Sequence, residues 1–436
     1  MLRQLEGSAA VARAVAACRP QVVCAYPITP QTHIVEGIGA MVKAGDLPGC
    51  RFINVESEFA AMSVAIGASA GGARAYTATA SQGLLFMAEA VYNAAGLGLP
   101  IVMTLANRAI GAPINIWNDQ SDAMAVRDSG WIQLFAESNQ AATDLHVQAF
   151  RLAEELSVPV MVCMDGFVLT HATEQVDVPT QAEVDAFLPP FEPRQLLDPD
   201  DPCSIGAMVG PEAFTEVRYL AHAKQLQALE RIEAVGRAFG DAFGRLSGGL
   251  VSPYRTEGAE VVVVALGSIL GTLADVVDDL RRAGRPVGAL GITSFRPFPA
   301  EAVRAAVGDG ARVVVVERAF SVGFGGVLAT DVAMAVGGGA GRVSTVVAGL
   351  GGRPVTERSL AGVIDDALRD RLEPLRFLDL DDQVVARELA RMAERRRSGP
   401  HAENILRDLG GAPLGPAAGA RPTPERRAGA PGGEGR

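Results

Sequence analysis

The sequence contains few residues that could hold an iron–sulfur cluster or a structural zinc ion. Only five cysteines occur among 436 residues, and no two of them form a Cys-x-x-Cys pair. Zinc sites and iron–sulfur clusters are usually held by cysteines at such close spacing. We therefore expect any iron–sulfur cluster that works with this chain to lie on another subunit. The cysteines are Cys18, Cys24, Cys50, Cys163 and Cys203.

Histidine is equally scarce. The five histidines are scattered, and no two stand at metal-ligand spacing on one predicted helix. We expect each to be a surface or packed imidazole rather than a catalytic group, and we predict no metal site on this chain. The histidines are His33, His146, His171, His222 and His401.

No hydrophobic run is long enough to cross a membrane. Glycine, proline or a charged residue interrupts each apolar stretch before the roughly 20 residues that a bilayer requires. Residues 1–7 also lack the apolar core of a secretory signal. We therefore expect a cytoplasmic protein with no membrane partner.

The charge balance argues against nucleic acid as a partner. The net charge of -11 repels phosphate backbones, and the dense basic run at residues 395–397 is expected at a solvated helix end. A composition of 48% hydrophobic and 20% charged residues is typical of a globular protein with enough apolar material for a large core.

The first part of the chain alternates short apolar runs with helical patterns, which predicts an α/β fold with a parallel sheet covered by helices. The length predicts two domains. The predicted strands are residues 21–26, 51–55, 73–79, 100–106 and 158–164, and the predicted helices are residues 58–70, 82–95 and 144–156, the last with Asp144 as its N-cap.

A proline-rich surface loop and a long helix follow. Residues 188–211 contain six prolines, and residues 212–243 have the apolar periodicity of one long helix. A linker at 247–258 leads into a second α/β unit with predicted strands at 260–266, 287–292, 312–316 and 342–348 and helices at 272–283 and 300–307. The predicted domains are residues 1–246 and 258–373, followed by a helical segment at 374–409, with a helix at 383–397, and a disordered tail at 410–436.

Three segments in the first domain follow the ends of predicted strands, where open α/β sheets bind their ligands. In the first segment, residues 26–30, two prolines bracket Thr29. They restrict the backbone around a hydroxyl that could bind a substrate. The alternative is a strand-to-helix turn in which Thr29 is an N-cap.

The second segment, residues 54–61, places Glu58 at the start of a nearly uncharged helix. Its carboxylate is either a charge favoured by the helix dipole or a proton-handling group in a desolvated place. Glu56 is the competing candidate. In the third segment, Arg108 follows a buried strand, where its guanidinium could bind a carboxylate through two hydrogen bonds. The alternative is an ion pair between Arg108 and an internal aspartate.

These three segments, together with residues 107–132, resemble the alpha subunit of the pyruvate:ferredoxin oxidoreductase family, whose members act on 2-oxoacids. The resemblance covers about residues 5–375 and is strongest before Leu188. It implies a thiamine-diphosphate-binding domain of the pyrimidine type, with a parallel sheet covered by helices. A smaller α/β domain like the C-terminal domain of transketolase would follow it.

The resemblance also implies the roles of the three residues. Glu58 matches the glutamate that contacts the pyrimidine ring and promotes formation of the thiazolium ylid. Thr29 and Arg108 match the positions that bind the 2-oxoacid, near its carbonyl and its carboxylate respectively. Oxalate-specific relatives carry arginine in place of the threonine, so Thr29 argues against oxalate as the substrate.

The activity implied is oxidative decarboxylation of pyruvate to acetyl-CoA and CO2 with reduction of ferredoxin, and coenzyme A is the cosubstrate. The chain would be active only with a beta subunit that holds the diphosphate and Mg2+. Gamma and delta subunits, or fused equivalents, would carry iron–sulfur clusters. The alternatives are a sister enzyme for 2-oxoglutarate or a branched-chain 2-oxoacid, and a noncatalytic scaffold subunit.

Two glycine-rich segments need separate interpretation. Gly308-Asp309-Gly310 is similar to the start of a diphosphate-binding motif, but no asparagine follows before Asn404. We therefore expect a turn at a helix C-terminus. The glycines at 323–326 follow a strand, but their spacing does not fit a dinucleotide fingerprint, and tight helix packing is expected instead.

Overall fold

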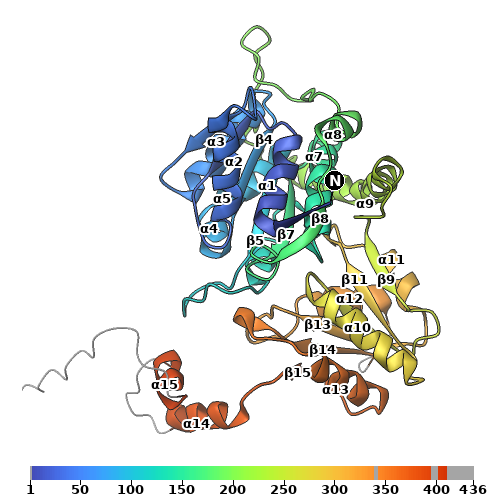
Figure 1. Ribbon diagram of the computed structural model, residues 1–436. Helices are drawn as coiled ribbons and strands as arrows, with labels where there is room; N and C mark the ends of the chain where they lie inside the picture. Colours follow the sequence, from blue (N-terminus) through green and yellow to red (C-terminus); the bar gives the residue numbers. More distant parts are fainter. Residues whose placement is uncertain (1, 338–341, 394–400, 410–436) are drawn as a thin grey trace, which may run out of the picture. The chain divides into compact units, whose positions relative to one another are not determined.

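The computed structural model describes residues 2–337, 342–393 and 401–409 (Figure 1). The chain divides into two compact units, Met1–Asp379 and Leu380–Arg436. None of the helices in the described part is both long enough and apolar enough to span a bilayer. The predicted disordered tail at 410–436 and the end of the predicted helix at 383–397 lie outside the described residues.

The first sheet has seven strands in the order β12-β6-β7-β5-β4-β2-β3. All neighbours are parallel except β12, which runs antiparallel to β6. The chain passes from β2 to β3 on one side and then returns to β4 on the other, and such a reversal marks the usual ligand site of an open parallel sheet. The strands are β2 (Val22–Ala25), β3 (Arg51–Asn54), β4 (Ala75–Thr79), β5 (Ile101–Asn107), β6 (Ile132–Phe135), β7 (Val160–Asp165) and β12 (Ser294–Arg296).

Helices cover both faces of this sheet. Val102 of β5 belongs to the hydrophobic core under α1, α2 and α7, whereas its neighbour Met103 belongs to the core under α3, α4 and α5. Strands buried on both faces explain the continuous apolar runs of the sequence. The helices are α1 (Gly7–Ala17), α2 (Thr32–Ala44), α3 (Glu58–Ala70), α4 (Ser81–Phe86), α5 (Ala88–Gly96), α6 (Ser121–Ala125) and α7 (Asn139–Leu156).

Two of the predicted helices differ from the structure. The predicted helix 82–95 is divided into α4 and α5, which meet at Met87. The predicted N-cap Asp144 is wrong, because α7 begins at Asn139 and Ser138 is its cap, accepting a hydrogen bond from the Ala141 N–H. Asp144 lies inside the helix and forms an ion pair with Arg245 at 2.7 Å, so tertiary pairing explains an acid that the sequence pattern assigned to capping.

The second sheet contains six strands in the order β15-β14-β13-β10-β11-β9, parallel except for β9. Its strand order also reverses, between β10 and β13. The strands are β9 (Val251–Tyr254), β10 (Val261–Ala265), β11 (Val287–Ile292), β13 (Arg312–Glu317), β14 (Val343–Val347) and β15 (Leu375–Phe377), and the helices are α10 (Ile269–Arg282), α11 (Ala300–Val307), α12 (Leu328–Val336), a 3-10 turn η1 (Leu350–Gly352) and α13 (Glu357–Leu368).

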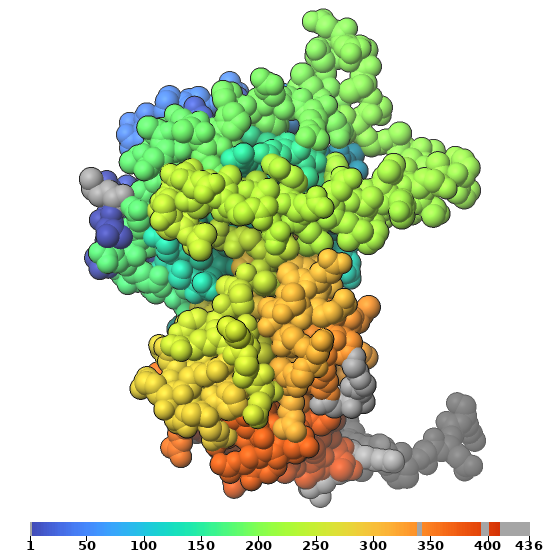
Figure 2. Space-filling model, turned by 90° about the vertical axis from the view of Figure 1, so that its right-hand side faces the viewer, coloured from blue at the N-terminus to red at the C-terminus, as the bar shows by residue number. Residues whose placement is uncertain are grey.

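The remaining elements connect these layers. β1 (Leu2–Glu6) pairs antiparallel with β8 (Thr173–Asp177), and α8 (Gln181–Phe187) precedes the predicted proline-rich loop. The predicted long helix is α9 (Phe214–Phe243), and Figure 2 shows the loop and the first turns of α9 projecting from the surface. In the second unit, α14 (Asp382–Ala393) contacts α15 (His401–Asp408) through Glu388 and His401 at 2.9 Å.

Candidate functional site

The residues predicted for the site come together at one edge of the first sheet. Because β2, β3, β4 and β5 are parallel, the segments that follow them leave the same edge. Thr29 lies in the turn after β2, Glu58 begins α3 after β3, and Arg108 follows β5 directly. The fold therefore brings three segments that are far apart in the sequence to a common edge.

Arg108 is tied to the turn that carries Thr29. Its Nη1 donates a hydrogen bond to the main-chain carbonyl of Thr29 at 2.8 Å, and its Nε donates to the carbonyl of Asn115 at 3.2 Å. The side chain is buried, which lowers the pKa of Arg108, while the nearby Asp122 opposes that shift. Among the described residues, Nη2 has no hydrogen-bond partner, so one arm of the guanidinium remains available.

The alternative of an ion pair between Arg108 and an internal aspartate does not hold among the described residues. Asp122 contacts the main chain instead, because its Oδ2 accepts from the backbone N–H of Arg108 at 3.0 Å. The guanidinium itself binds carbonyl groups, which compensate its charge only in part. An anion bound at Nη2 would complete that compensation.

Thr29 is exposed and is not the N-cap of the following helix. α2 begins at Thr32, and its N-cap residue is Gln31. The buried amide of Gln31 donates to the carbonyl of Ala78 in β4 at 2.6 Å, which fixes the turn against the sheet. The Thr29 hydroxyl is therefore held on a positioned turn and is accessible from solvent.

Glu58 is buried at the first position of α3, whereas the competing Glu56 is exposed. The helix is capped by Ser57, which accepts a hydrogen bond from the Ala60 N–H at 3.2 Å. The Glu58 carboxylate accepts no hydrogen bond from any described residue. Low exposure at the ligand edge of the sheet, with no hydrogen-bond partner among the described residues, distinguishes Glu58 from the exposed Glu56.

Gly83 of α4 lets the side chains of Glu58 and Thr79 approach its backbone closely. A Cβ at Gly83 would lie 2.7 Å from Oε1 of Glu58 and 2.5 Å from Oγ1 of Thr79. The Thr79 hydroxyl is buried and has no hydrogen-bond partner. Two polar groups without a hydrogen-bond partner among the described residues thus lie near each other at Gly83, and a polar ring such as a pyrimidine could bond to both.

Asp122 organises this edge and was not predicted from the sequence. Its fully buried carboxylate accepts hydrogen bonds from the backbone N–H groups of Ser81 at 2.9 Å and Arg108 at 3.0 Å, and from the side chain of Asn107 at 2.8 Å. Burial raises the pKa of Asp122 to about 7, although these hydrogen bonds lower it. Asp122 thus joins the β4–α4 turn to the end of β5. Because Asp122 belongs to no motif and stands at no regular spacing from other polar residues, the sequence contains no indication of this role.

Residues from the part of the chain that forms the second sheet hold the loop that follows Arg108. The Asn115 side chain donates to the carbonyl of Gly351 at 3.1 Å, and Gln120 donates its backbone N–H to the carbonyl of Arg318 at 2.8 Å. Arg318 also forms an ion pair with Asp165, at the end of β7, at 2.7 Å. Because Asn115 supplies a carbonyl to Arg108, residues after position 300 help to position the predicted substrate arginine.

Both glycine-rich segments adopt structures consistent with the expectations. Gly308 is the C-cap of α11, and β13 begins at Arg312, so the Gly-Asp-Gly triplet is a turn between a helix and a strand. At the end of β13, the carboxylate of Glu317 accepts hydrogen bonds from the backbone N–H groups of Val327 and Leu328, each at 2.8 Å. Glu317 therefore occupies the helix N-terminus where a dinucleotide phosphate would bind.

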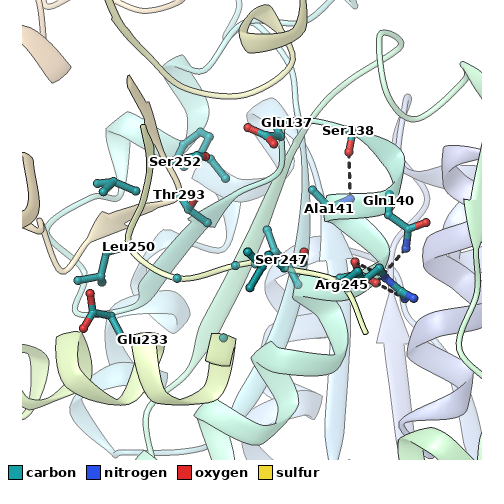
Figure 3. A pocket seen from close by; sticks show the side chains of 18 of the residues that line it. Glu137, Ser138, Gln140, Ala141, Glu233, Arg245, Ser247, Leu250, Ser252 and Thr293 are labelled. Atoms are coloured by element: carbon teal, nitrogen blue, oxygen red, sulfur yellow. Dashed lines mark hydrogen bonds and ion pairs between the residues drawn. The ribbon is translucent and has the colours of Figure 1, made fainter. Parts of the chain in front are cut away.

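A separate cavity of about 540 Å³ lies between α7, α9 and the segment at 245–253. Figure 3 shows Arg245 reaching into this region, where it pairs with Asp144, and Ser138 bonded to the Ala141 N–H. None of the three predicted site residues lines this cavity. The predicted residues therefore lie at the sheet edge and take no part in this cavity.

The chain is similar to proteins of a known family. Residues 13–237 match the family model described as pyruvate flavodoxin/ferredoxin oxidoreductase, thiamine diphosphate-binding, and residues 259–360 match pyruvate:ferredoxin oxidoreductase core domain II. The chain is 46% identical to the pyruvate synthase subunit PorA of Methanosarcina barkeri over 87% of this chain and 97% of that protein.

Two further proteins are similar to this chain at lower identity. The ketoisovalerate oxidoreductase subunit VorA of Pyrococcus abyssi is 40% identical over 83% of this chain and 92% of that protein. A solved 2-oxoglutarate:ferredoxin oxidoreductase from Magnetococcus marinus shares the fold with a TM-score of 0.67 at 20% identity, and the match covers 84% of this chain but 65% of that one. On the family models and the long alignments, this chain is a member of the pyruvate:ferredoxin oxidoreductase family.

Proposed function

We propose that this chain is the alpha subunit of a pyruvate synthase, which converts pyruvate, coenzyme A and oxidised ferredoxin into acetyl-CoA, CO2 and reduced ferredoxin. The observation that carries the proposal is the convergence of Glu58, Thr29 and Arg108 at the ligand edge of the first sheet. The 46% identity to a pyruvate synthase subunit supports pyruvate over the branched-chain acids, because the ketoisovalerate relative is less similar, at 40% identity.

Thiamine diphosphate, when bound, supplies the electron sink that decarboxylation of a 2-oxoacid needs. Glu58 would hold the pyrimidine ring, since its carboxyl has no hydrogen-bond partner among the described residues and lies near the unpaired hydroxyl of Thr79 at Gly83. A proton on this carboxyl could then be exchanged with a ring nitrogen. The exposed Glu56 is not given a role.

Arg108 and Thr29 would bind the substrate. The free Nη2 of Arg108 suits a carboxylate, and the burial of the guanidinium strengthens a charge-assisted hydrogen bond. The Thr29 hydroxyl could donate to the carbonyl oxygen of the 2-oxoacid. Because the two residues are joined through the Thr29 main chain, the geometry of this pair would be set before the substrate binds.

The proposal includes partner chains. A beta subunit would hold the diphosphate and Mg2+, and gamma and delta subunits, or fused equivalents, would carry the iron–sulfur clusters that pass electrons to ferredoxin. The cysteines support this division, because the sequence has no Cys-x-x-Cys pair and no group of possible metal ligands among the described residues contains a cysteine. We place the assembly in the cytoplasm.

Copurification from the native host tests the proposal. An assembly that contains this chain and iron, and that reduces ferredoxin only with coenzyme A and a 2-oxoacid, would support it. We expect pyruvate to give a higher kcat/KM than 2-oxoglutarate or 2-ketoisovalerate. A higher value for either competitor would assign the chain to the sister enzyme instead.

The scaffold alternative makes a distinct prediction for site variants. If the chain only supports its partners, assemblies with Thr29→Ala, Glu58→Gln or Arg108→Ala would turn over normally. We expect all three to lose activity while the subunit composition of the assembly stays the same.

A further inference from the structure

The fold brings together two histidines and one glutamate that the sequence shows far apart. Glu6 ends β1, His33 lies in the first turn of α2, and His171 lies in the turn between β7 and β8. One ligand atom from each residue lies within 4.8 Å of the other two. The imidazole rings of His33 and His171 are 4.9 Å apart between centroids. Spacing along the sequence did not indicate that His33 and His171 lie side by side.

An ion pair explains only part of this cluster. His33 contacts Oε1 of Glu6 through Nδ1 at 2.8 Å, which accounts for two of the three residues. His171 adds a second imidazole, and two protonated rings at this distance would repel each other. Neutral imidazole is the form that binds metal ions.

The position of His171 is fixed by its neighbours. Its Nδ1 lies 2.8 Å from the hydroxyl of Thr170, which in turn accepts a hydrogen bond from the Phe167 N–H at 2.8 Å. The ring of Phe167 lies 4.6 Å from the His171 ring, between centroids. A hydrogen bond on one ring nitrogen orients the other, and this arrangement is common among metal-binding histidines. Among the described residues, Nε2 of His171 has no partner.

We propose that Glu6, His33 and His171 form a site for one divalent transition-metal ion of the zinc class. Two imidazoles and one carboxylate are the donor set that zinc and its neighbours accept, with further positions left to water. The three donor atoms lie within 4.8 Å of one another. Zinc ligands in a tetrahedron lie roughly 3.3 Å apart when metal–nitrogen bonds are about 2.0 Å. Small side-chain movements would therefore bring the donors to binding distance.

The bound ion would brace the turn that carries Thr29. The turn that contains His171 begins at Gly166, where a Cβ would lie 2.6 Å from Pro30. His33 follows Pro30 closely on α2. A metal ion shared by both histidines would thus join the two segments that flank Pro30, and would join them to the first strand of the chain through Glu6.

The test is a calorimetric titration of the full untagged chain with ZnCl2 after treatment with a chelator and desalting. We expect one site per chain and a higher melting temperature with zinc. Replacing a ligand in His171→Ala or Glu6→Gln should weaken binding at least about 100-fold, and Thr170→Val should weaken it about 10-fold through loss of orientation.

The control is His222→Ala, which removes an exposed histidine on α9 and should leave zinc affinity unchanged. Circular dichroism without metal shows whether each variant is folded, and Glu6→Gln provides a mild second variant if His171→Ala is not. The proposal is overturned if the wild-type chain binds no zinc, or if the folded ligand variants bind it as tightly as His222→Ala does.

Discussion

The guanidinium of Arg108 donates a hydrogen bond to the main-chain carbonyl of Thr29 at 2.8 Å, so the two predicted substrate residues form one structural pair. Asp122 holds the backbone of Arg108 from the other side at 3.0 Å. Changes at Arg108 should therefore affect both its own contact with the substrate and the position of the Thr29 turn.

Arg108→Ala should raise KM for pyruvate more than it weakens binding of thiamine diphosphate, because the free arm of the guanidinium is assigned to the substrate carboxylate. Loss of a hydrogen bond to a charged group costs about 1.5–3 kcal/mol, which corresponds to roughly a 10- to 150-fold lower kcat/KM. Steady-state kinetics of the assembled enzyme measure this. Arg127→Ala, which removes a partly buried arginine from the same span, is the control. A larger effect on the cofactor would assign Arg108 to the cofactor.

Thr29→Val should lower kcat/KM for pyruvate about 5- to 10-fold, since it removes one neutral hydrogen bond of about 1 kcal/mol. The bond from Arg108 should remain, because it reaches the main chain of Thr29. Thr29→Ser keeps the hydroxyl and should retain most of the activity. Equal activity of the valine variant and wild type would remove the hydroxyl from the mechanism.

Gly83→Ala should weaken cofactor binding in the assembled enzyme. The added Cβ would lie 2.7 Å from Oε1 of Glu58 and 2.5 Å from Oγ1 of Thr79, so the carboxylate has to move. Gly67→Ala is the matched control, because that helical glycine has nothing within 4 Å of the added Cβ. It should be neutral or stabilise α3 by about 0.5–1 kcal/mol. Equal cofactor affinity in both variants would contradict the assignment of this space.

The isolated chain should bind thiamine diphosphate weakly or not at all. The Gly-Asp-Gly triplet forms a helix-to-strand turn, and Glu317 fills the helix N-terminus that follows the next strand, so neither segment offers a diphosphate site. Calorimetry with and without the partner chains measures this difference. Tight binding by the chain alone would show that it holds the diphosphate itself.

Glu317 should make folding stability depend on pH. Burial raises the pKa of Glu317 to about 7, against about 4.3 for an unfolded chain. Between these values the folded state binds more protons, so the free energy of unfolding falls as the pH rises, by at most ~1.4 kcal/mol per unit. Glu317→Gln lacks this titration. Urea unfolding between about pH 4.5 and pH 8 should show wild type losing stability relative to the variant, and parallel curves would contradict the assignment.

The sequence predicted the alternation of strands and helices well, because strands buried on both faces are continuous apolar runs. It did not predict β6, a short strand that includes the buried Gln133, whose Nε2 donates a hydrogen bond to the carbonyl of Ala123. It also misassigned Asp144, since an ion pair with Arg245, distant in the sequence, explains that acid better than helix capping does. Such long-range pairs leave no local pattern.

The convergence of the candidate segments was predictable, because they follow strand ends. Glu58 and Arg108 stand at such positions, and the fold brings their segments to one edge. Asp122, Gly83 and the cluster of His33 with His171 could not be predicted, because their meaning depends on contacts between segments far apart in the chain. Spacing along a single helix is the wrong criterion for ligands that converge from separate elements.

The most direct measurement is a structure of the assembled enzyme with thiamine diphosphate and pyruvate. The account predicts the Glu58 carboxyl against the pyrimidine ring, with the free arm of Arg108 on the substrate carboxylate. A map in which Glu58 turns away from the ring and another acid takes that position would contradict it.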